Sequence, residues 1–220
     1  MKKQHVIIFL SLSLICVSLS AQNVNLPTAY LRNQLSGKNN LPKNVTGSPY
    51  VNDVFQKGKV NIGEDTFSTA IRYNGLRDEF EIKNKDYETI SLLRRPDVIV
   101  TMEGKKYQIF HYMDQGVNKQ AYFQVLNEGE SQLLIKEGVE FKDAVKASSS
   151  YGTDKPASLD PYKKYYIVKN GEPAVEVRLK KRDILDIFSG SDTKKYVSQN
   201  NLKLKNEFEV ITLLNYTNSK

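Results

Sequence analysis

The chain has 220 residues, and its 32 Lys and Arg outnumber its 25 Asp and Glu to give a net charge of +7. Its single Cys excludes a disulfide within the chain. The basic residues stand in short groups spread along the sequence, which is typical of solvated strand edges and helix ends. We therefore expect no nucleic-acid partner.

The first 21 residues have the pattern of a secretory signal peptide. Lys2 and Lys3 precede an apolar run from Val6 to Leu19, and small residues ending in Ala21 follow it. The run is short for a membrane span, and no positive charges follow it at once as a stop signal. We predict cleavage between Ala21 and Gln22.

A lipoprotein signal is the alternative that Cys16 raises. Lipid attachment needs a small residue directly before the Cys, whereas Ile15 stands there. Removal of residues 1–21 leaves 199 residues with no Cys, with His111 as the one His, and with a net charge of +5. We expect a soluble exported protein with no transmembrane segment, located in the periplasm, at the outer membrane or outside the cell.

Residues 22–48 are rich in Asn, Lys, Gly and Pro, and their few apolar residues keep no long period. This composition predicts a flexible N-terminal arm with room for one short helical turn. Apolar residues become frequent from Tyr50 onward. We expect a single β-rich domain over residues 49–220, which is long enough to bury a core.

Successive β-hairpins are the main signal in this domain. Turn pairs at Asn74-Gly75, Glu103-Gly104 and Asn170-Gly171 separate runs with strand-like alternation. A further hairpin surrounds "NEGE" at residues 127–130. The segment "EFKDAV" at residues 140–145 predicts an edge strand before a Ser-rich loop.

The period changes to a helical one in the C-terminal part, about residues 180–216. Asp192 is a candidate N-cap, and Asn206 with Glu209 has the spacing of a capping box. Phe208, Ile211 and Leu214, with Val210 and Leu213 beside them, are spaced to cover a core. Strands first and short helices last predict an α+β fold: an antiparallel meander, or open curved sheet, followed by C-terminal helices.

Common catalytic and cofactor motifs are missing. The mature chain would lack the several His or Cys of a zinc site and the Cys of a Cys–His pair. Glycine-rich phosphate loops, a GxSxG elbow and a calcium loop are absent too. We predict no cofactor and no metal, and catalytic residues stay unknown. His111 is predicted to be a packing residue on a strand face with Tyr107 and Ile109.

Asp78 is the one acidic residue that the hairpin at residues 70–82 sets among apolar side chains. A two-residue turn at Asn74-Gly75 would place Asp78 opposite Ile71 and would pair Arg72 with Arg77. Three interpretations stay open. The turn is longer and Asp78 is exposed; Asp78 is buried and bound to backbone N–H groups or an Arg; or Asp78 lines a pocket and acts on a ligand.

Three segments, "GSPYVNDVFQKGKV", "IRYNGLRDEFEIK" and "YVSQNNLKLKNEFEVITLLNY", resemble exported, uncharacterised β-rich proteins of Bacteroidota-type bacteria. The resemblance runs from about Gly47 to Tyr216 and rests on strand, turn and helix patterns. It implies export and a β-rich fold, and it supplies no catalytic residues.

These features favour a non-enzymatic exported protein that binds an unknown ligand or an envelope protein. An apolar ligand cradled by a curved sheet is one form of this hypothesis. The alternative is a hydrolase acting on envelope polymers or other exported substrates, which predicts a cleft where His111 or a close carboxylate pair meets other polar groups.

Overall fold

A computed structural model describes residues 26–33, 41–42, 44–84, 86, 88–147 and 153–220. The predicted signal peptide and its cleavage site at Ala21 and Gln22 lie outside these residues. The described elements are η1 (Thr28–Tyr30), β1 (Leu31–Asn33), β2 (Thr46–Gly47), β3 (Gln56–Ile62), β4 (Asp65–Asn74), β5 (Glu79–Lys83), β6 (Thr89–Leu92), β7 (Val98–Met102), β8 (Lys105–Asp114), β9 (Val117–Val125), β10 (Ser131–Lys142), β11 (Ser158–Lys169), β12 (Val175–Val177), α1 (Lys181–Ile187), α2 (Ser191–Gln199) and α3 (Glu207–Asn218).

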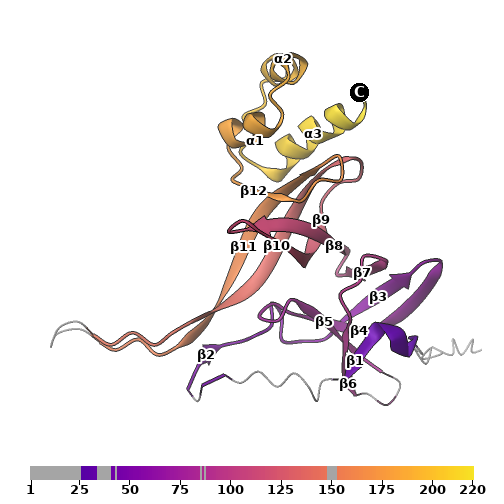
Figure 1. The fold of residues 1–220 in the computed structure, drawn as a ribbon, viewed down its shortest axis with the longest axis vertical. Helices are drawn as coiled ribbons and strands as arrows, with labels where there is room; N and C mark the ends of the chain where they lie inside the picture. The colour runs from indigo at the N-terminus through magenta and orange to yellow at the C-terminus, as the bar shows by residue number, and fades with distance from the viewer. Residues whose placement is uncertain (1–25, 34–40, 43, 85, 87, 148–152) are drawn as a thin grey trace, which may run out of the picture.

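The fold is β-rich α+β, with one curved, largely antiparallel sheet and three short C-terminal helices (Figure 1). The strand order is β1-β6-β5-β4-β3-β7-β8-β9-β10-β11-β12, and β2 adds to β11 in parallel. The path departs from a simple meander because β7 pairs with β3, not with β6. The connection from β6 to β7 therefore returns across the sheet.

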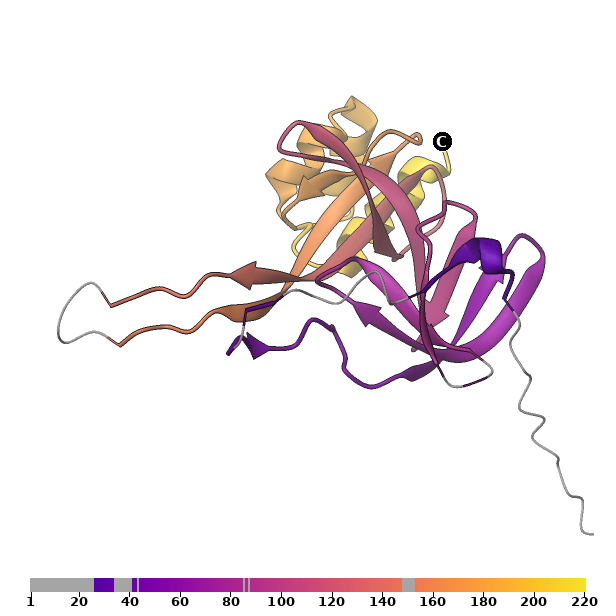
Figure 2. The same ribbon diagram turned by 60° about the horizontal axis from the view of Figure 1, so that its bottom comes forward.

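The β10–β11 hairpin is the longest pairing, running from Ser131↔Lys169 to Lys142↔Ser158. Its far end projects away from the rest of the molecule in both views (Figures 1 and 2). The segment expected as a separate edge strand at residues 140–145 is partly the end of β10, followed by an isolated bridge from Val145 to Lys155.

Three buried clusters fill the faces of the sheet. The first is formed by Leu26 and by residues of the strands β3 to β9. In it, Phe80 packs between Tyr73 and Tyr122, with 4.8 Å between the ring centroids in each pair. The second lies under the helices, and the third surrounds Phe123 between β8 and β11. Because the protein's own side chains occupy these faces, the sheet has no need of a bound apolar molecule to complete its core.

The N-terminal segment differs from the expected flexible arm over Leu26–Asn33. Strand β1 pairs with β6, and Leu26 is only 5% exposed within the first core cluster. An ion pair between Arg32 and Glu79 adds a link to β5. The few apolar residues of this segment therefore cover an edge of the core, while the predicted helical turn is present as η1.

The helices begin close to their predicted positions. The Asn206 side chain accepts a hydrogen bond from the Glu209 N–H at 2.9 Å, as the capping box predicts, although the Glu209 carboxylate reaches Lys205 instead of Asn206. Helix α2 begins at Ser191, so that Asp192 lies in its first turn and Gly190 is the N-cap. No helix within the described residues is long and apolar enough to cross a membrane.

The predicted core face of α3 is confirmed at Val210, Leu213 and Leu214 and is wrong at Phe208. Val210, Leu213 and Leu214 are fully buried, whereas Phe208 is 78% exposed. Phe208 lies in the first turn of α3, beside Glu207, whose carboxylate accepts a hydrogen bond from the Tyr165 hydroxyl of β11.

Candidate functional site

The predicted two-residue turn at Asn74-Gly75 is wrong. Strands β4 and β5 pair Ile71 with Ile82 and Tyr73 with Phe80, which leaves residues 75–78 as the loop. Asp78 ends this loop with φ of +55°, and it does not face Ile71. The predicted clash of Arg72 with Arg77 disappears, because Arg72 faces Glu81 and forms an ion pair with it.

Tertiary contacts explain why the Asn-Gly pair is not the turn. A Cβ atom on Gly75 would lie 3.0 Å from the backbone of Gly138 and Val139, and the Val139 N–H donates to the Gly75 carbonyl at 3.1 Å. Asn74 is buried, and its side-chain oxygen accepts from the Arg77 N–H at 3.1 Å. Gly75 is thus needed for a close approach to β10.

Asp78 is bound by four donors, one from its own hairpin and three from later parts of the chain. The Tyr122 backbone N–H donates to it at 3.2 Å, and the Lys136 ammonium lies 3.0 Å away. The Tyr73 hydroxyl also donates to the carboxylate, and the Arg94 guanidinium lies at 3.5 Å. The turn is therefore longer than two residues, as in the first sequence interpretation. The carboxylate is bound to donors, as in the second, and is only partly exposed.

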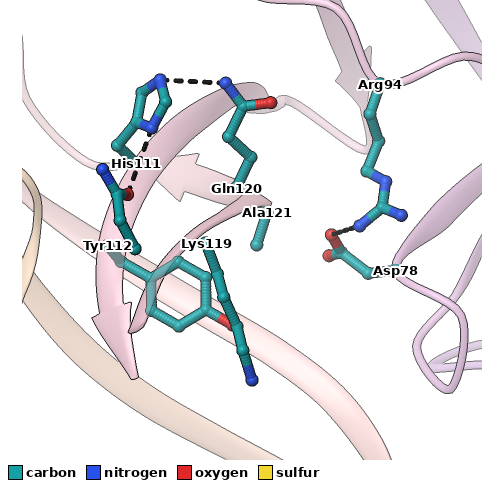
Figure 3. A pocket seen from close by; sticks show the side chains of 8 residues that line it. Asp78, Arg94, His111, Tyr112, Lys119, Gln120 and Ala121 are labelled. Atoms are coloured by element: carbon teal, nitrogen blue, oxygen red, sulfur yellow. Dashed lines mark hydrogen bonds and ion pairs between the residues drawn. The ribbon is translucent and has the colours of Figure 1, made fainter. Parts of the chain in front are cut away.

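A cavity of about 720 Å³ opens beside this carboxylate (Figure 3). Asp78 and Arg94 form one wall, and the other comes from the β8–β9 hairpin, with His111 and Gln120 opposite Arg94. The complete lining is Asp78, Arg94, His111, Tyr112, Asn118, Lys119, Gln120 and Ala121. All but Ala121 carry polar or charged groups.

His111 is an exposed residue of this wall and not the packing residue that we predicted. Its Nδ1 lies 3.2 Å from the Asn118 side-chain oxygen, and its Nε2 lies 2.9 Å from the Gln120 side-chain nitrogen. Both ring nitrogens are thus within hydrogen-bond distance of side-chain amides. The reason for its exposure is that the hairpin runs past the core at this point, beyond the buried Tyr107 and Ile109.

Tyr112 connects this cavity with a second one of about 410 Å³. The second lining is Tyr112, Asp114, Lys136, Val139, Glu140, Tyr162, Lys164 and Tyr166. Tyr112 is held by perpendicular ring contacts with Phe123 and Tyr166, at 5.6 Å and 5.8 Å between centroids. The ring that separates the two cavities is therefore fixed by packing.

The tyrosines around Asp78 have a raised pKa. Burial, followed by the nearby Asp78 carboxylate, raises the pKa of Tyr73 well above its ordinary value. The same two causes raise the pKa of Tyr162 to about 12. Burial and Asp114 raise the pKa of Tyr112. These phenols therefore keep their protons near neutral pH, and the Tyr73 hydroxyl donates to Asp78.

A close carboxylate pair exists elsewhere, at Glu79 and Glu81. Both lie within 3.3 Å of the Arg77 guanidinium, and both are at most 5% exposed. Arg72 and Arg32 supply further positive charge to this pair. The pair lines neither of the two cavities, and its ion pairs indicate a structural role.

The lining of the cavity consists mainly of charged and amide side chains. Its lining contains no Ser, Thr or Cys nucleophile. Both His111 nitrogens are engaged by side-chain amides. Among the described residues, no group of three or more His, Cys, Asp or Glu is arranged to hold a metal ion.

Comparison of the chain with protein-family models, with curated proteins and with solved structures finds no match. The functional interpretation therefore rests on geometry. Sequence reasoning singled out Asp78 and His111 separately, and the structure places both in one lining. It missed Arg94 and Lys136, because nothing local in their sequence shows that they meet Asp78.

Proposed function

We propose that the protein is a non-enzymatic binding protein whose Asp78 cavity takes a polar ligand with a carboxylate group. The position of Arg94 is the main observation in support of a carboxylate ligand. Lys136 already neutralises Asp78 at 3.0 Å, so Arg94 at 3.5 Å adds positive charge that this carboxylate does not balance. A planar guanidinium can bind a carboxylate in a bidentate manner, through two parallel N–H···O hydrogen bonds.

The other wall supports a polar ligand. Asn118, Gln120 and His111 offer both donors and acceptors on neutral groups. Lys119 adds a second cation, although Asp114 pairs with it at 2.7 Å. A cavity of this volume is within the range that holds small organic ligands. A polar ligand replaces the apolar one in the sequence hypothesis, because the faces of the sheet are filled.

Export is part of the proposal. The signal pattern of residues 1–21, with cleavage between Ala21 and Gln22, supports it, and so does the resemblance to exported Bacteroidota-type proteins. The protein would act in the periplasm, at the outer membrane or outside the cell. An envelope protein that presents a carboxylate side chain or C-terminus is a ligand of the same chemistry.

The hydrolase alternative has one supporting observation, which is that His111 and Asp78 line the same cavity. It is the weaker candidate because Asp78 is ion-paired with Lys136 and both ring nitrogens of His111 contact side-chain amides. Hydrolysis of a glycan or peptide by the purified chain, lost on His111→Gln, would support this alternative.

The test is calorimetric titration of the chain from Gln22 to Lys220. The probes are D-glucuronate and N-acetyl-Ala-Ala with a free carboxylate, with D-glucose and the dipeptide amide as neutral counterparts. We expect one or both carboxylates to bind and the neutral counterparts to bind at least about tenfold more weakly.

Arg94→Gln should weaken binding by about tenfold or more. Arg95→Gln is the matched control, because Arg95 is equally exposed at 44% against 43% but pairs with Asp97 outside the cavity. Failure of both carboxylates to bind, or equal effects of the two substitutions, would contradict the proposal.

A further inference from the structure

The two cavities on either side of Tyr112 present a continuous series of polar groups. The first offers Arg94 and the amides of Asn118 and Gln120, and the second offers Lys164 and Glu140. Since Tyr112 lines both, a ligand longer than one small unit can contact the two linings together. A single small molecule fills only one of them.

The second cavity has two tyrosines, Tyr162 and Tyr166, in addition to the shared Tyr112. Tyr162 lies against Gly138, where an added Cβ would come within 2.5 Å of the Tyr162 ring. Gly138 faces Tyr162 across β10 and β11, so the missing side chain leaves room for that ring. With Tyr112 and Tyr166, this region carries three tyrosines among Lys and Glu side chains.

This mixture matches the chemistry of sugars. A pyranose ring has apolar C–H faces that pack on aromatic rings, and its hydroxyl groups need both donors and acceptors around its edge. Peptide recognition depends more on apolar anchor pockets. Apart from Ala121 and Val139, the two linings have no aliphatic residue.

We propose that the two cavities form one groove for an acidic polysaccharide, with the carboxylate of one sugar unit at Arg94 and the next units passing Tyr112 toward Tyr162 and Lys164. This inference rests on the proposed function and names its ligand class. It makes binding depend on chain length, which the proposed function alone does not require.

The experiment uses galacturonate, its α-1,4-linked dimer and its tetramer, titrated into the chain from Gln22 to Lys220. The fully methyl-esterified tetramer is the neutral counterpart of the same length. We expect the tetramer to bind about tenfold or more tighter than the monomer, and the ester to lose most of that affinity.

Two variants separate the parts of the groove. Arg94→Gln should weaken monomer and tetramer by the same factor. Lys164→Gln should weaken the tetramer alone, and it leaves the fold intact because Lys164 is an exposed residue whose ion-pair partner among the described residues is the exposed Glu176. Tyr112→Leu should remove the advantage of length, with far-ultraviolet circular dichroism as the check on its fold.

The outcomes of the two proposals are distinguishable. Equal affinity for monomer and tetramer overturns the groove and leaves the proposed carboxylate site standing. Binding of N-acetyl-Ala-Ala in the absence of any galacturonate binding does the same. Equal binding of the acid and ester tetramers overturns the role of Arg94, and with it both proposals.

Discussion

The Asp78 carboxylate lies 3.0 Å from the Lys136 ammonium, although 58 residues separate the two in sequence. Lys136 stands on β10, and its side chain is only 7% exposed. Asp78 is the last residue of the loop between β4 and β5, which lie several strands away from β10 in the sheet. The pair therefore ties two distant sections of one curved sheet together beside the candidate site.

Replacing Asp78 by Asn should destabilise the protein by on the order of 3 kcal/mol, because the shape is kept while a buried ammonium loses its counter-charge. Urea denaturation followed by circular dichroism measures the loss. Asp97→Asn is the control, since it removes an exposed pair with Arg95 and should cost much less than the Asp78 substitution. Equal losses in the two variants would mean that Asp78 does not stabilise the sheet contact.

Gly75→Ala should cost about 1–3 kcal/mol, because its Cβ would press on the backbone of Gly138 and Val139, which cannot move aside as a side chain can. Gly63→Ala is the comparison. Gly63 has φ of +58° and nothing within 4 Å of an added Cβ, so that only backbone strain of about 1 kcal/mol applies. The midpoint temperature of thermal unfolding should be highest for the wild type, lower for Gly63→Ala and lowest for Gly75→Ala.

Stability should fall as the pH rises above 10. Buried tyrosines, Tyr73 and Tyr162 among them, have a pKa raised above the ordinary value of 10.0, so the folded state keeps phenol protons that the unfolded chain releases. The stabilisation is complete below pH 10 and is lost as the pH approaches about 12, the pKa of folded Tyr162. Denaturant titrations across this range measure it.

Spectrophotometric titration of the phenols supplies the check on that assignment. Tyr162→Phe should reduce the slope of stability against pH in the alkaline range. Ionisation of all the tyrosines near pH 10 with the fold still intact would contradict the effect of burial.

The two faces of α3 should respond differently to truncation. Leu213→Ala removes a side chain that is fully buried under the sheet, and it should cost about 2–5 kcal/mol. Phe208→Ala removes a larger side chain that is 78% exposed, and it should change stability by no more than about 0.5 kcal/mol. A larger effect at Phe208 in urea denaturation would show that this residue is covered in solution.

Expression in a host with a signal peptidase tests export. The mature protein should start at Gln22, and intact mass spectrometry should show the loss of residues 1–21. Native mass spectrometry of the same sample reports any retained ligand as an excess that disappears on denaturation. An intact N-terminus in a correctly exported chain would contradict the predicted cleavage.

Local chemistry decided which turns could be predicted. At Asn170-Gly171 both residues have positive φ, as the two-residue turn requires, and the same holds at Glu103-Gly104. The unpredicted turn at Gln115-Gly116 has this geometry as well. Asn74-Gly75 failed because Gly75 serves a contact with β10, which lies 63 residues further along at Gly138.

The site was beyond sequence reasoning for a related reason. The order of the strands depends on which strands pair over long sequence distances. No local sequence pattern indicates that β3 pairs with β7. That pairing brings the loop at Arg94 toward the β8–β9 hairpin. Asp78 could be singled out because an acidic residue stood among apolar ones, whereas Arg94 and Lys136 resemble any other basic residue of the chain.

The tie between Asp78 and Lys136 also sets an order of events when the chain folds. The ribosome makes the loop at Asp78 well before β9 and β10. The carboxylate can therefore form its contacts with the Tyr122 N–H and the Lys136 ammonium only after those strands have been made. Contacts of such long sequence separation slow folding, because the intervening chain must first be brought together. Strands β4 and β5 are therefore expected to acquire their final rigidity late, in the same step that completes the cavity.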